Sequence, residues 1–174
     1  MKPQQIVFFS LISLFLFSCT GIKSTGKTDK YVHLFYTDIG AVQYFVKPLD
    51  YESDDDLEAS IDFTFRDTVD SPQVRMMFSV YSEAPLSGHS ECAVGLSDAQ
   101  LIQAEKVYAE PIKKAYVYRY EAIIEYSDFV ELVRNQSSFF VKLGNSNVTL
   151  LPSKKTIKAL PHIDKKTITM LETR

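Results

Sequence analysis

The fold is decided by the stretch Leu57-Glu58-Ala59-Ser60-Ile61-Asp62-Phe63-Thr64-Phe65-Arg66, in which apolar and polar side chains alternate. A period of two is typical of a β-strand with one face on a core and the other face in water. Residues 74–81 repeat the alternation, and the polar segment between the two runs is turn-like. The two runs therefore predict an antiparallel pair of strands.

Further strand signals lie on both sides of this pair. Upstream, residues 31–36 and 41–46 are rich in β-forming residues, and Pro48 is expected to end the second run. Residues 82–95 are expected to form a loop, after which Ser97 either caps a short helix or, as we favour, belongs to more loop. The strands predicted further along the chain are residues 105–111, 115–126, 139–143 and 148–151, with a hairpin turn between the last two.

Two segments change to a helical period. Residues 127–136 place apolar side chains at helical spacing, and Asp128 with Glu131 has the spacing of a capping box. Pro152-Ser153 opens a second short helix, which Pro161 is expected to stop after Leu160.

The fold class predicted from these elements is mainly β. We expect an antiparallel β-sandwich or a curved sheet with two short helices. The segment 165–170 is expected to add a last edge strand. The net charge of −3 argues against a nucleic-acid binder.

The amino-terminal segment, MKPQQIVFFSLISLFLFSCTG, has one positive charge and then an apolar run from Ile6 to Phe17. That run is too short for a membrane span, which needs about 20 apolar residues. A charged start, a short apolar run and small residues are typical of a secretory signal.

Leu16-Phe17-Ser18-Cys19 then resembles a bacterial lipobox, although Phe17 stands where a smaller residue is usual. The resemblance implies cleavage before Cys19, a diacylglyceryl group on its thiol and an acylated amino end, with fatty acids such as palmitate. Several acyl chains give stable membrane attachment where one does not. Thr20, in place of an acid, implies an outer-membrane lipoprotein facing the periplasm. The alternative is an ordinary signal peptide that happens to end near a cysteine.

The domain organisation follows from this signal. Residues 1–18 are the signal peptide, 19–29 are the lipidated cysteine and a flexible polar tether, and 30–174 are a single β-rich domain. Cys92 is then the only thiol left, so no disulfide forms within the mature domain.

The layout is similar to small uncharacterised lipoproteins of Bacteroidota. The resemblance rests on the lipobox and tether, on IDFTFR at 61–66, on YRYEA at 118–122 and on SDF at 127–129. It implies no particular activity. Asp67-Thr68-Val69 resembles the short O-glycosylation motif of Bacteroidota secreted proteins, which implies glycosylation of Thr68 in an exposed turn.

Catalytic and metal signatures are sparse. His89, Glu91 and Cys92 offer a thiolate nucleophile or metal ligands, but they lie within four residues, and we favour a polar loop with one half-buried thiol. Asp54-Asp55-Asp56 with Glu58 offers carboxylates to a hard cation, without the spacing of an EF-hand loop. We therefore expect no catalytic residue, no bound metal and no cofactor.

Two surfaces are candidates for binding. Tyr116, Tyr118 and Tyr120 share one strand face, where exposed rings would stack on sugars and buried rings would pack in the core. The carboxyl-terminal part of the chain is basic, and this charge either meets lipid phosphates or only keeps the surface soluble. Its basic residues are Lys154, Lys155, Lys158, Lys165, Lys166 and Arg174.

The leading expectation is a non-enzymatic membrane-anchored lipoprotein that presents a β-rich domain to an envelope protein partner. The alternative is a glycan- or small-ligand-binding module that uses the tyrosine face. A third hypothesis is an enzyme that uses Cys92 and His89. The sequence leaves open the identity of the partner or ligand, the membrane leaflet and the oligomeric state.

Overall fold

The computed structural model describes residues 29–37, 40–54, 57–67, 72–83, 91–96, 101–113 and 115–173. Within these ranges the strands are β1 (Val32–Tyr36), β2 (Val42–Glu52), β3 (Glu58–Arg66), β4 (Val74–Ser82), β5 (Cys92–Gly95), β6 (Leu101–Ile112), β7 (Ala115–Ile124), β8 (Phe139–Leu143) and β9 (Ser146–Pro152). The helices are α2 (Tyr126–Arg134), α3 (Lys154–Lys166) and the short α4 (Ile168–Glu172). The predicted mainly β fold is confirmed.

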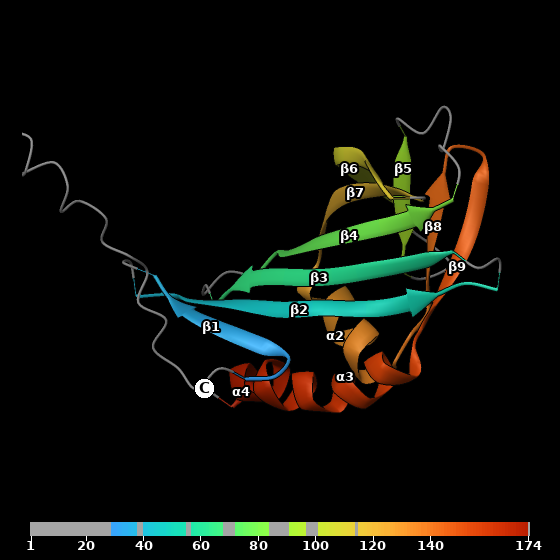
Figure 1. The fold of residues 1–174 in the computed structure, drawn as a ribbon. Coiled ribbons are helices and arrows are strands. Elements are labelled where there is room, and N and C mark those ends of the chain that lie inside the picture. The colour runs from blue at the N-terminus through green and yellow to red at the C-terminus, as the bar shows by residue number, and fades with distance from the viewer. Residues whose placement is uncertain are drawn as a thin grey trace, which may run out of the picture.

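The strands form one curved antiparallel sheet in the order β1-β2-β3-β4-β7-β6-β5-β8-β9, and the end of β2 also pairs with β9 (Figure 1). Strand β6 makes the sheet continuous, because its first part pairs with β5 and its second part pairs with β7. The register shifts between Lys106 and Tyr108, and such a bulge bends a strand. The structure thus has the curved-sheet form of the predicted fold and not two stacked sheets.

The alternation along β3 and β4 places one face of each strand in the core, as predicted. Ile61 pairs with Phe78 and Phe63 pairs with Met76, and all four side chains are buried. Asp62 and Met77, which lie between these residues and pair with each other, are on the opposite face of the sheet. The predicted antiparallel pair is confirmed.

Helix α2 packs its apolar side against this buried face. The ring of Phe129 lies 5.1 Å from that of Phe63 and 5.2 Å from that of Phe65, measured between centroids. Its N-cap is Glu125, which makes no side-chain cap hydrogen bond, and Asp128 lies within the first turn. The helix prediction is therefore confirmed, but the predicted capping box is wrong.

Three strand predictions need correction. Strand β6 begins at Leu101 and not near Glu105 as expected, so residues 101–104 form a strand and not a loop. Strand β2 continues past Pro48, because a register shift between Val46 and Leu49 places the proline, which cannot donate to a ladder, at an irregularity. The expected loop over 82–95 contains β5, whose four residues are all buried and therefore show no alternation.

The carboxyl-terminal part also differs from the prediction. Helix α3 begins as expected at the N-cap Ser153, whose Oγ accepts a hydrogen bond from the Thr156 backbone N–H at 3.2 Å. It continues through Pro161 to Lys166, because the proline lies on the exposed side while neighbouring apolar residues are buried. The expected edge strand at 165–170 is wrong, since this segment ends α3 and begins α4.

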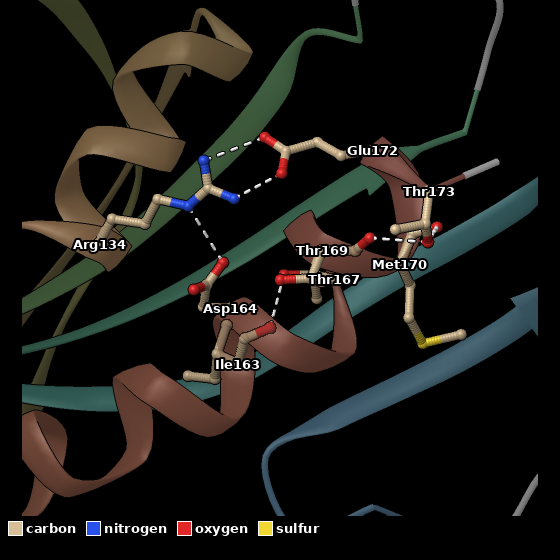
Figure 2. Close-up of polar contacts among 8 residues, drawn as sticks. All are labelled: Arg134, Ile163, Asp164, Thr167, Thr169, Met170, Glu172 and Thr173. Carbon is tan, nitrogen blue, oxygen red and sulfur yellow. Dashed lines mark hydrogen bonds and ion pairs between the residues drawn. The ribbon is translucent and has the colours of Figure 1, made fainter.

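Arg134 joins the three helices (Figure 2). From the last turn of α2 its guanidinium donates to Asp164 Oδ1 on α3 at 3.2 Å. It also donates to both carboxylate oxygens of Glu172 on α4, at 3.0 and 2.6 Å. A bidentate arginine–carboxylate pair fixes orientation as well as distance, so Arg134 holds α4 against the other two helices.

Candidate functional site

The tyrosine face predicted from the sequence is mostly buried. Tyr120 is fully inaccessible, Tyr118 is 8% exposed and Tyr116 is half-buried. The Tyr120 ring stacks on Phe78 with centroids 5.3 Å apart, and burial raises the pKa of its hydroxyl to about 12. These rings pack within the core and present no open row on which a sugar could stack, so the structure gives no support to the ligand-binding alternative.

The thiol of Cys92 lies on β5 and is only 1% exposed. Burial raises its pKa to about 12, so the group is a neutral thiol at physiological pH and not a thiolate. Glu91 is exposed, and His89 lies outside the described residues. A buried neutral thiol packs as a small apolar side chain, and this role explains Cys92 within the part of the chain that the structure describes.

The other sites predicted from the sequence are only partly visible. Cys19 and Thr68 lie outside the described residues, as do Asp55 and Asp56 of the acidic run. Among the residues that are described, no group of three or more His, Cys, Asp or Glu side chains is placed to hold a metal ion.

A polar cluster that sequence reasoning did not single out lies on the outer face of the sheet. Arg119 on β7 donates to Ser79 Oγ on β4 at 2.9 Å and forms an ion pair with Asp62 on β3. Asp62 is nearly inaccessible, and the ion pair with Arg119 offsets part of the cost of burying its side chain. The cluster ties three neighbouring strands together, and its role is structural.

The most exposed apolar surface of the sheet is on β6. We call residues 105–112 the β6 edge. All eight are exposed, and they include Val107 at 50%, Tyr108 at 42% and Ile112 at 42%. Within the described residues this part of β6 pairs with β7 alone, because β5 pairs only with residues 101–104. One side of the β6 edge therefore has main-chain groups that no described strand pairs with.

The outer face of the sheet extends this apolar surface. Tyr108 pairs with Arg119 across β6 and β7, and Tyr81 pairs with Val117 across β4 and β7, so these side chains share one face. Tyr81 is also exposed, whereas Val117 is buried between its neighbours. A sequence signal for an edge was present, because Glu105, Lys106 and Pro111 are of the types that natural edge strands carry.

Comparisons with protein-family models, with curated proteins and with solved structures find no match. Within the described part of the chain, none of the helices has the length and apolar character needed to cross a membrane.

Proposed function

We propose that this chain is a non-enzymatic lipoprotein, anchored in the cell envelope through Cys19, whose β-rich domain binds another envelope protein. The lipobox at 16–19 and the polar tether that follows support the anchor. The observation that supports protein binding is the β6 edge, where exposed apolar side chains lie beside a strand edge that no described element covers.

The partner we propose is an extended segment that adds a strand to β6. Strand addition draws its affinity from main-chain hydrogen bonds and its specificity from alternate side chains. Pairing would run along residues 105–110, since Pro111 has no N–H to donate. Tyr108 and Val107 provide the apolar contacts, and aromatic residues are enriched at protein interfaces.

Charges on the same strand restrict the choice of partner. Glu105, Lys106 and Glu110 alternate in sign along the β6 edge and are all exposed. Such charges disfavour indiscriminate strand pairing, so a partner must match them as well as the apolar positions.

The test places a photo-activatable cross-linking amino acid at Val107 in intact cells. The matched control places it at Lys142, which is exposed on β8. Both positions are combined with wild-type Cys19 and with Cys19→Ala. We expect one defined envelope protein to be captured from Val107, not from Lys142, and only with the anchored form.

The outcomes separate the parts of the proposal. Equal capture from both positions, or none from Val107, would contradict the β6 edge as the binding site. Equal capture with and without Cys19 would show that the anchor is not needed for the interaction. A protein that lacks acyl chains at Cys19 by intact-mass analysis would contradict the anchor itself.

A further inference from the structure

Helix α3 carries a row of lysines on its outward side. Lys154, Lys158 and Lys165, which we call the lysine face, are spaced by four and seven residues, so they lie within about 40° of one another around a helix of 3.6 residues per turn. All three are exposed. The opposite side of the helix is buried in the domain through Thr156, Ala159, Leu160 and Ile163.

The positive charge of the lysine face is not neutralised by the acids around it. Asp164 and Glu172 pair with Arg134, and Asp50 pairs with Lys155 at 2.9 Å. No ion pair is found for the three lysines among the described residues. The lysine face therefore presents a net positive surface.

Helix stability does not explain every one of these lysines. Lys154 is in the first turn of α3, where the positive end of the helix dipole favours acids, and this turn contains no acid. A residue that breaks a local rule without local compensation points to a role outside the helix.

The last residue of the tether, Asp29, lies beside the same helix. Asp29, the first described residue, lies 2.8 Å from His162 on α3, between Oδ2 and Nε2. The ring of Tyr31 also contacts the ring of His162, with centroids 5.6 Å apart. Nine residues lie between Cys19 and Asp29, and the ten steps along the chain that join these two residues span at most about 35 Å. A chain anchored at Cys19 therefore keeps Asp29, and the part of α3 around His162 that it contacts, within about 35 Å of the membrane surface.

We propose that the lysine face of α3 rests on the anionic phospholipid headgroups of the membrane that holds the anchor. This inference rests on the anchored function proposed above. Each lysine near an anionic surface strengthens its attraction by about fivefold, so three give on the order of 100-fold. In Figure 1, α3 and β6 lie at opposite ends of the domain, so this orientation turns the β6 edge away from the lipid.

The experiment uses the mature protein with its anchor, purified from membranes and inserted into lipid nanodiscs. One set of discs contains phosphatidylcholine alone, and the other adds phosphatidylglycerol. A short pulse of an amine-acetylating reagent at low salt is followed by mass spectrometry of individual lysines. We expect Lys158 to react at least about fivefold more slowly in the anionic discs than in discs of phosphatidylcholine alone. Lys106 and Lys142, both exposed on the sheet, should react at the same rate in both kinds of disc.

Two double variants, with Lys158 as the reporter, sharpen this test. Lys154→Gln with Lys165→Gln should return the reaction rate of Lys158 close to its value in phosphatidylcholine, as should high salt. The matched control, Lys106→Gln with Lys142→Gln, removes the same charge elsewhere and should leave the protection in place.

The results distinguish failure of the inference from failure of the proposed function. An acylated Cys19 with no protection of Lys158, or with equal protection in both kinds of disc, would overturn the inference and leave the anchor standing. A protein without acyl chains would overturn the anchored function and the inference with it.

Discussion

Replacing Phe129 by alanine should remove much of the packing between α2 and the sheet. The ring is fully buried, and its centroid lies within 5.2 Å of those of Phe63 and Phe65. Truncation of a buried phenylalanine costs about 3–5 kcal/mol, and the two aromatic contacts place this site near the upper end, at about 4–5 kcal/mol. That is at least about a quarter of the total stability of a typical domain, and it corresponds to a fall in melting temperature of about 12–15 °C.

The assay is urea unfolding followed by far-ultraviolet circular dichroism, since the chain has no tryptophan. Phe45→Ala is the matched control, because this ring is only half-buried and should cost about 1 kcal/mol or less. If the two variants lost similar free energy of unfolding, the reasoning that places Phe129 at the centre of the core would be refuted.

The Cys92 thiol should react with iodoacetamide far more slowly in the native protein than in urea, because burial raises its pKa to about 12; fast native labelling at pH 8 would contradict this. Partial burial by itself would raise the pKa of Asp29, but hydrogen bonds from the Tyr31 backbone N–H and from His162 lower it below its ordinary value. A carboxylate with a lowered pKa stabilises the fold above pH about 4 and loses that contribution as the pH falls. Asp29→Asn should therefore weaken the fall in free energy of unfolding between about pH 4 and lower pH, measured by urea unfolding. The same fall in the variant and in the wild type would refute the stabilising role of the Asp29 carboxylate. Ser153→Ala should lower the free energy of unfolding in urea by about 1 kcal/mol, because it removes the N-cap of α3. Ser153→Asp keeps a capping group and should lower it by less. An equal loss of free energy in the two variants would argue against capping by Ser153.

The lysine face and the β6 edge, which support the two proposals, differ in how far they could be predicted from the sequence. The three lysines of α3 were recognised as part of a basic segment, but a helix that stopped before Pro161 would not have placed Lys165 on the same face as Lys154. The exposure of Tyr108 was not predicted at all, because exposure on a sheet depends on which strand lies next to it.

The tyrosine face is a second case in which the sequence did not decide whether side chains are exposed. The alternation along β7 placed Tyr116, Tyr118 and Tyr120 on one side of a strand, as the structure has them. It left open whether that side faced the core or solvent. The answer came from the partner strands, since β4 and β6 flank β7 and the curved sheet places this side inward.

The sequence by itself determined that β3, β4 and β7 extend as strands with one apolar face, where the β8–β9 hairpin turns and that α2 forms. These features are encoded within a few residues by periodicity and turn chemistry. Only the tertiary structure decided that β5 is a strand, that β2 reaches β9, that the β6 edge stays open and that α3 continues through Pro161. The physical reason is that alternation specifies a face but not a neighbour, and that burial of Leu160 and Ile163 offsets the roughly 3 kcal/mol that a proline costs a helix.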